Sequence, residues 1–206
     1  MKCKGGWRVG HALQGSREGS REIAMQLGML GKKRRMKFSA LTLTYNGSSK
    51  QGISACTDSD WASDSTSQQS QTGYFIKMAK GLISWTSRAQ KTIALSSTEA
   101  EYMTLSDCSC QVVWIHTLLG ELRYHMKAIP ICRDNQGSIF ISSNPVTKKR
   151  SKHIDIRYHY IREVISRNLV EVYYIEGEEN PADLLTKNLG IVKFQKFRAI
   201  LGFKFL

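Results

Sequence analysis

Proline, paired cysteines and long apolar runs are scarce in this sequence of 206 residues. The 3 prolines exclude a proline-rich linker or repeat protein. No apolar run approaches the roughly 18 residues that a membrane-spanning helix needs, so we expect no membrane partner. The chain starts with charged residues and no apolar stretch behind them, so we expect no secretory signal.

The 5 cysteines are an odd number without paired spacing. Small secreted domains that depend on disulfides usually carry an even number of cysteines at regular spacings. The pattern therefore argues against a disulfide framework and favours a reducing compartment. We expect an intracellular protein, either cytoplasmic or nuclear.

Acidic residues are also few, with 17 Asp and Glu against 30 Lys and Arg, which gives a formal net charge of +13. A chain with this charge attracts polyanions, of which nucleic acid is the usual candidate. A soluble basic domain that does not bind nucleic acid fits the same composition. Only the sequence motifs can distinguish these two interpretations. The length and the hydrophobic share of 41% suffice for one domain with a core.

The spacing of apolar residues predicts an α/β domain. The β-prone runs and the helical patterns alternate in an order that is typical of helices layered on a mixed sheet. Ser96 or Ser97 can cap the longest helix, and Pro181 suits the first position of a late one. The expected elements are strands near residues 52–58, 73–78 and 82–86, a helix over 98–119, a strand at 128–133, helices at 136–142 and from about 151, a strand at 170–175 and a helix from 180.

Composition divides the chain into three parts. Residues 1–40 are punctuated by glycine, carry a basic run and show no lasting period, so we expect a leader of doubtful structure. Residues 41–190 contain the predicted strands and helices. Residues 191–206 carry an apolar stripe that predicts an amphipathic C-terminal helix packed on the domain.

Four carboxylates lie at predicted strand ends or near predicted helix starts, where they could together form a catalytic metal site: Asp58, Glu101, Asp134 and Asp183. If they converge on one edge of the sheet, each pair repels by about 4 kcal/mol at an effective dielectric constant near 20, so a cation must lie among them. Oxygen ligands of this kind suit Mg²⁺ or Mn²⁺, and two such ions about 4 Å apart form a clamp for phosphoryl transfer. Each acid also suits a plain structural role as a turn former or a helix-dipole partner.

Several sequence blocks occur together: residues 57–64 (TDSDWASD), 82–102 (LISWTSRAQKTIALSSTEAEY), 134–138 (DNQGS), 151–163 (SKHIDIRYHYIRE) and 180–187 (NPADLLTK). In this order they resemble the RNase H domain of copia-type retrotransposon polyproteins, over about residues 41–203. The resemblance implies an RNase H-like fold, in which a mixed five-stranded sheet has three antiparallel strands, then parallel additions, and flanking helices. It also implies a truncated piece of a polyprotein, without its reverse transcriptase, integrase and protease parts.

The resemblance further implies that Asp58, Glu101, Asp134 and Asp183 are the catalytic residues and hold two Mg²⁺ or Mn²⁺ ions. Glu101 is preferred to Glu99 also because positions two apart on a helix point to nearly opposite sides. The implied reaction is hydrolysis of the RNA strand of an RNA–DNA hybrid during reverse transcription, beside the reverse transcriptase domain and inside a retroelement particle. The alternative is a catalytically inactive nucleic-acid-binding remnant.

Two residues depart from the family pattern. Arg133 precedes Asp134 where the family usually carries a smaller residue. Gly137 replaces the usual Ser or Ala in the following helix and weakens that helix by about 1 kcal/mol. Neither departure removes a carboxylate.

The segment of residues 147–162 contains six Lys and Arg residues and one Asp. On a helix these cations form a ridge that can contact phosphates without reading base sequence. A solvated helix face is the alternative. The residues that we expect to contact nucleic acid are Lys148, Lys149, Arg150, Lys152, His153 and Arg157.

Overall fold

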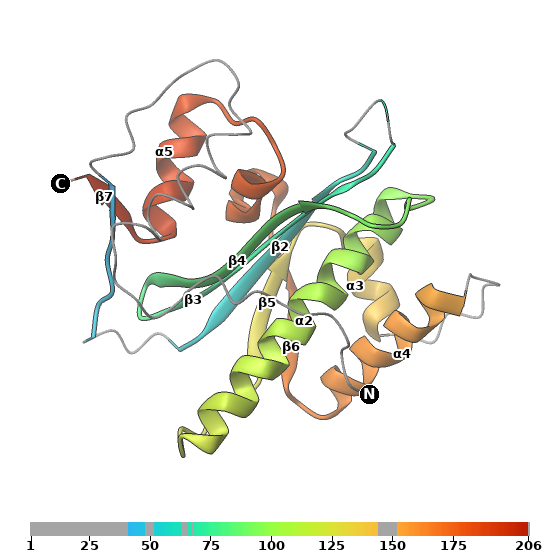
Figure 1. The fold of residues 1–206 in the computed structure, drawn as a ribbon, viewed down its shortest axis with the longest axis horizontal. Helices are drawn as coiled ribbons and strands as arrows, with labels where there is room; N and C mark the ends of the chain where they lie inside the picture. Colours follow the sequence, from blue (N-terminus) through green and yellow to red (C-terminus); the bar gives the residue numbers. More distant parts are fainter. Residues whose placement is uncertain (1–40, 48–51, 63–65, 67, 144–151, 206) are drawn as a thin grey trace.

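The computed structural model describes residues 41–47, 52–62, 66, 68–143 and 152–205. These residues form a mixed five-stranded sheet with helices on both faces, and a two-stranded ribbon beside it (Figure 1). The sheet strands are β2 (Ser54–Asp60), β3 (Gln71–Met78), β4 (Gly81–Ala89), β5 (Ile129–Arg133) and β6 (Val170–Tyr174).

The strands lie in the order β4-β3-β2-β5-β6. The first three strands along the chain pair antiparallel, whereas β5 pairs parallel with β2 and β6 pairs parallel with β5. This order brings the carboxyl ends of β2 and β5 to the same edge of the sheet. The predicted fold class, with three antiparallel strands followed by parallel additions, is confirmed.

The longest helix, α2 (Ser97–Glu121), starts at a capped end. The Oγ atom of Ser96 accepts a hydrogen bond from the backbone N–H of Glu99 at 3.2 Å. The Glu99 carboxylate in turn accepts one from the backbone N–H of Leu95 at 3.1 Å. These reciprocal bonds satisfy N–H groups that the helix itself cannot, and they fix where the helix starts. The position of Glu101 near this start is fixed with it.

Two apolar cores lie on opposite faces of the sheet. On one face, α2 and α4 (Lys152–Ser166) pack on the sheet, and the rings of Tyr102 and Tyr158 stack with centroids 3.9 Å apart. On the other face lie the 3-10 helix η3 (Pro181–Leu185) and α5 (Ile191–Ile200) (Figure 1). The helix α3 (Gln136–Ser143) and the short 3-10 helix η2 (Gly177–Glu179) follow β5 and β6. No helix in these described residues has the length and apolar character needed to cross a membrane.

The C-terminal segment is helical only in part. The helix α5 ends at Ile200, and Gly202 adopts a positive φ of 88°. A Cβ atom at Gly202 would lie 2.8 Å from the carbonyl oxygen of Lys80, so this turn requires glycine. Residues Phe203–Phe205 then form β7, which pairs antiparallel with β1 (Leu41–Leu43). The segment expected to be one helix over residues 191–206 is therefore a helix followed by a strand.

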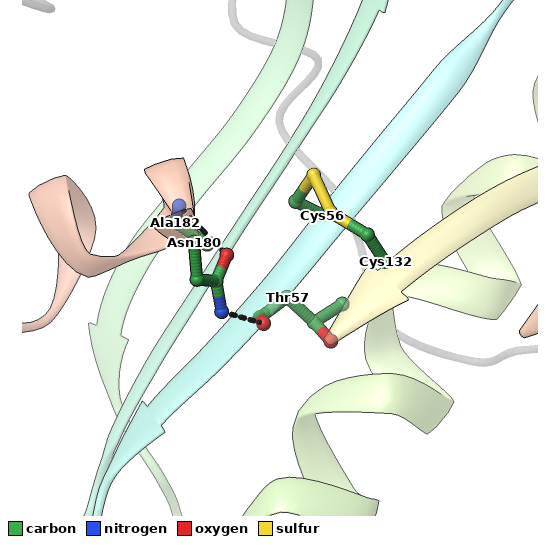
Figure 2. Close-up of a disulfide and its surroundings, with 5 residues drawn as sticks. All are labelled: Cys56, Thr57, Cys132, Asn180 and Ala182. Carbon is green, nitrogen blue, oxygen red and sulfur yellow. Dashed lines mark hydrogen bonds between the residues drawn. A yellow bond between two sulfur atoms is a disulfide. The ribbon is translucent and has the colours of Figure 1, made fainter. Parts of the chain in front are cut away.

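The cysteine pattern argues against a disulfide framework, yet the structure contains a disulfide. Cys56 of β2 and Cys132 of β5 face each other in the parallel register, with Cα atoms 4.4 Å apart, and form a disulfide (Figure 2). The two cysteines are 76 residues apart in the chain, and only the pairing of β2 with β5 makes them neighbours. Spacing in the sequence carries no sign of that pairing.

Candidate metal and catalytic centre

Three of the four predicted acids converge beside one edge of the sheet. Asp58 lies in β2 two residues after Cys56, and Asp134 follows β5 two residues after Cys132. Because the two cysteines are in register, both aspartates lie at the same level of neighbouring strands. Asp183 of η3 completes the group, and one carboxylate oxygen from each aspartate lies within 4.8 Å of the others. The side chains of Asp58 and Asp183 are buried, whereas Asp134 is half-buried.

The position of Asp183 depends on Asn180, which caps η3. The Nδ2 atom of Asn180 donates a hydrogen bond to the carbonyl oxygen of Thr57 at 3.0 Å (Figure 2). Its Oδ1 atom accepts one from the backbone N–H of Ala182 at 3.1 Å. Asn180 is completely buried, so one side chain both starts the helix and ties it to β2 directly before Asp58.

Close packing between η3 and β3 also depends on Gly73. A Cβ atom at this position would lie 2.5 Å from Cγ2 of Thr186 and 2.9 Å from Cβ of Leu185. Contacts this short do not occur between real side chains, so any larger residue would push η3 away from the sheet. The absence of a side chain at Gly73 therefore lets Asp183 approach Asp58.

Two lysines contact the acidic cluster, and the sequence analysis did not identify either of them. The Nζ atom of Lys187 lies 3.1 Å from Oδ1 of Asp58 and 2.8 Å from Oδ1 of Asp183. The Nζ atom of Lys193 lies 3.0 Å from Oδ2 of Asp183. Lys187 follows Asp183 by four positions, a spacing that often brings two charges together in a helix, and this signal could have identified it.

Lys187 partly offsets the effect of burial on the pKa of Asp58. Burial, followed by the negative charge of Glu101, raises the pKa of Asp58 to about 7. Lys187 and a hydrogen bond from the Thr186 hydroxyl act in the opposite direction. Burial lowers the pKa of the Lys187 ammonium, but Asp58 and Asp183 outweigh it and raise that pKa overall. The Asp58 carboxylate thus needs nearby cations to be fully ionised.

The fourth predicted acid, Glu101, lies near the cluster but is bound differently. Its Oε1 atom accepts a hydrogen bond from the backbone N–H of Ser59 at 2.8 Å. Its Oε2 atom lies 2.7 Å from Nη2 of Arg133 and forms a buried ion pair with it. Burial raises the pKa of the Glu101 carboxyl, and the charge of Arg133 lowers it. Glu101 is not part of the group of three oxygens that lie within 4.8 Å of one another.

The three aspartates fit a divalent cation. Their oxygen donors are the kind that Mg²⁺ and Mn²⁺ prefer. The cluster already draws the ammonium groups of Lys187 and Lys193 against it, which shows that its charge requires compensation. The partial exposure of Asp134 leaves one side of the cluster open.

Of the residues expected to contact nucleic acid, only Arg157 has a described side chain. Lys148, Lys149 and Arg150 lie outside the described residues, and Lys152 and His153 are described only as the helical start of α4. Arg157 points to α2, where its Nη1 atom lies 2.8 Å from Oδ1 of Asp107. The basic ridge therefore stays a prediction.

The sequence comparisons find relatives among retrotransposon polyproteins, although no family model matches the chain. The retrovirus-related Pol polyprotein from transposon TNT 1-94 of Nicotiana tabacum is 39% identical over 156 residues, which is 76% of this chain and 12% of the relative. The corresponding polyprotein from transposon RE2 of Arabidopsis thaliana is 37% identical over 151 residues, 73% of this chain and 10% of the relative. The chain thus spans about a tenth of the length of these curated relatives.

The structure comparison identifies the fold. LC11-RNase H1, isolated from compost, superimposes with a TM-score of 0.50 at 17% sequence identity, over 66% of this chain and 92% of that one. The chain has an RNase H fold, and its homologues are copia-type Pol polyproteins. The resemblance seen in the sequence is confirmed on both counts.

Proposed function

We propose that this chain, an RNase H-fold domain with homologues among copia-type Pol polyproteins, is a retroelement ribonuclease H that hydrolyses the RNA strand of RNA–DNA hybrids. The observation that carries the proposal is the convergence of Asp58, Asp134 and Asp183 within 4.8 Å. These residues come from three distant parts of the chain. Two of them are buried, where uncompensated carboxylates are unfavourable, so the fold maintains a costly arrangement that suits cation-dependent chemistry.

Two bound Mg²⁺ or Mn²⁺ ions would supply the chemistry by lowering the pKa of an attacking water and stabilising the leaving oxygen. The residues of the chain would hold and orient the reacting groups. Asp58 and Asp183 form the buried side of the site, and Asp134 forms the side open to substrate. Glu101 is the fourth acid in the proposed mechanism.

The proposed substrate follows from the fold and the charge together. A formal net charge of +13 favours a polyanion, and an A-form-like hybrid is recognised through its shape and 2′-hydroxyl groups. The proposed partner is the reverse transcriptase domain of the parent polyprotein, which produces such hybrids. The proposed location is a retroelement particle in the cytoplasm or the nucleus.

The test is a cleavage assay with the full chain and a hybrid whose RNA strand is labelled. We expect cleavage of RNA in the hybrid with Mg²⁺ or Mn²⁺, none with EDTA, and none of single-stranded RNA or duplex DNA. Asp134→Asn should abolish cleavage because it replaces a carboxylate of the cluster with an amide. Glu121→Gln makes the same chemical change at an exposed position near the end of α2 and should cleave like the native chain.

Two outcomes would contradict the proposal. Cleavage that persists in Asp134→Asn would show that the cluster does not carry the reaction. Salt-sensitive binding of the hybrid without cleavage, by a chain that is folded and binds Mn²⁺, would favour the inactive remnant instead.

A further inference from the structure

The side chain of Arg133 is completely buried between β5 and α2. Its exposed fraction is 0%, and that of its partner Glu101 is 6%. The Nη2 atom of Arg133 lies 2.7 Å from Oε2 of Glu101, while its Nε and Nη1 atoms have no hydrogen-bond partner among the described residues. Arg133 directly precedes Asp134 in the chain, and its partner Glu101 lies close enough to the acidic cluster for its charge to raise the pKa of Asp58.

This ion pair differs in kind from the lysine contacts. The side chain of Lys187 is 39% exposed, and its ammonium group can move into water when another cation arrives. The buried guanidinium group of Arg133 cannot move into water in this way, and it stays charged at any accessible pH. Taking Glu101 away would leave a buried, unpaired cation, which is strongly unfavourable. Glu101 is therefore held by a cation that cannot leave.

The cations of the centre differ in how firmly they are held. Lys193 is shared with Glu178 at 3.3 Å, and Lys187 is partly exposed, so a divalent ion can displace either ammonium group from the aspartates. A second ion that uses Glu101 must approach the buried guanidinium group of Arg133, which repels it.

We infer that Arg133 is a positioning residue that makes the metal positions of this centre unequal, because it competes with the second ion for Glu101. The first position, formed by Asp58, Asp134 and Asp183, fills readily. A position that uses the Glu101 carboxylate fills only when the buried pair with Arg133 opens. This inference rests on the proposed function and concerns how the ions are distributed in it.

The test counts Mn²⁺ ions on the full, chelator-treated chain by isothermal titration calorimetry and electron paramagnetic resonance. The native chain should bind one ion, and a second at least about tenfold more weakly, because the second must break a buried ion pair. Arg133→Met keeps the apolar stem and frees Glu101, so the second ion should bind at least tenfold more tightly than in the native chain. Circular dichroism establishes whether this variant is folded.

Counting ions on the native chain keeps the test valid if Arg133→Met does not fold. Glu101→Gln leaves Arg133 unpaired, so circular dichroism must also show that this variant is folded. The folded variant should keep the affinity for the first ion within about threefold of native, whereas Asp134→Asn should lower it far more. The inference is overturned if the native chain binds two ions equally, or if Glu101→Gln weakens the first ion as much as Asp134→Asn does. Equal binding together with hybrid cleavage would refute only the inference. Tighter binding of the second ion by Arg133→Met, without cleavage by the native chain, would support the inference and refute only the proposed function.

Discussion

Cys56 and Cys132 face each other on neighbouring parallel strands, and each precedes an aspartate of the acidic cluster by two residues. The disulfide thus joins β2 and β5 two residues before the positions of Asp58 and Asp134. The repulsion between these carboxylates acts to separate the same strands that the disulfide holds together. The disulfide therefore opposes the repulsion between the carboxylates of the acidic cluster.

Reduction of this disulfide should destabilise the domain. It closes a segment of 76 residues, for which the chain-entropy model gives a stabilisation of about 4.5 kcal/mol. We expect a lower urea midpoint in dithiothreitol, and the same low midpoint for Cys132→Ser with or without reductant. Cys110→Ser removes a cysteine outside the disulfide and should keep the native response to reductant. Equal midpoints of the native chain in both conditions would contradict the prediction.

Lys187→Met should have opposite effects on stability and on metal binding. Without metal, the variant loses a cation that lies 3.1 Å from Asp58 and 2.8 Å from Asp183, so it should be less stable by about 1 to 2 kcal/mol. With Mn²⁺ it should bind the first ion several-fold more tightly, because a competitor has been removed. Lys196→Met serves as the control, since Lys196 pairs with Glu179 on the surface. Weaker Mn²⁺ binding by Lys187→Met would show that the lysine supports the ion.

The stability of the metal-free chain should depend on pH through Asp58. Its pKa is raised from 3.8 to about 7, so between these values the folded chain holds a proton that the unfolded chain has lost. Stability should therefore fall as pH rises from about 4 to about 7, by up to roughly 1.4 kcal/mol per pH unit from this group. Urea unfolding in EDTA measures this slope.

Two comparisons isolate the contribution of Asp58 to that slope. Asp58→Asn carries no titrating group at this position, so its slope should be smaller than the native one. Saturating Mn²⁺ should also flatten the native curve, because a bound cation keeps the carboxylate ionised. A native slope that is unchanged in both comparisons would assign the effect to other residues.

Gly73→Ala should disturb the centre from a distance. The added Cβ atom would overlap Thr186 and Leu185, so η3 has to move, at a cost of about 1 to 3 kcal/mol. The shift should also weaken Mn²⁺ binding, because Asp183 lies on η3. Gly120→Ala is the matched control, since nothing lies within 4 Å of its added atom and it stands in α2, where alanine should stabilise by about 0.5 to 1 kcal/mol. Thermal melts with and without Mn²⁺ compare the two variants.

Local sequence signals predicted most of the fold. The Ser96 cap, the long apolar period of α2 and the β-prone runs correspond to observed elements because each is determined within a few residues. The late helix started by Pro181 proved to be a short 3-10 turn, and the tail ended in a strand. The conformation of each segment depends on a tertiary partner. The strand β3 packs against η3, and β1 pairs with β7.

Only part of the candidate site could be predicted, because some of its contacts join residues far apart in the chain. Asp58, Asp134 and Asp183 could be named from the family motifs, and the structure brings them together. The partners of these acids could not be named, because the pairing of Arg133 with Glu101 joins β5 to α2 across 32 positions of the chain. The disulfide likewise arises only when β2 and β5 lie side by side.

The ribbon of β1 and β7 has a consequence for engineering. Thr42 pairs with Lys204, so the two ends of the described fold lie next to each other and away from the acidic edge of the sheet (Figure 1). Domains with adjacent ends tolerate circular permutation at exposed turns. A short peptide that joins the ribbon, with new ends opened at another surface loop, should leave β2, β5 and η3, which position the aspartates, uncut.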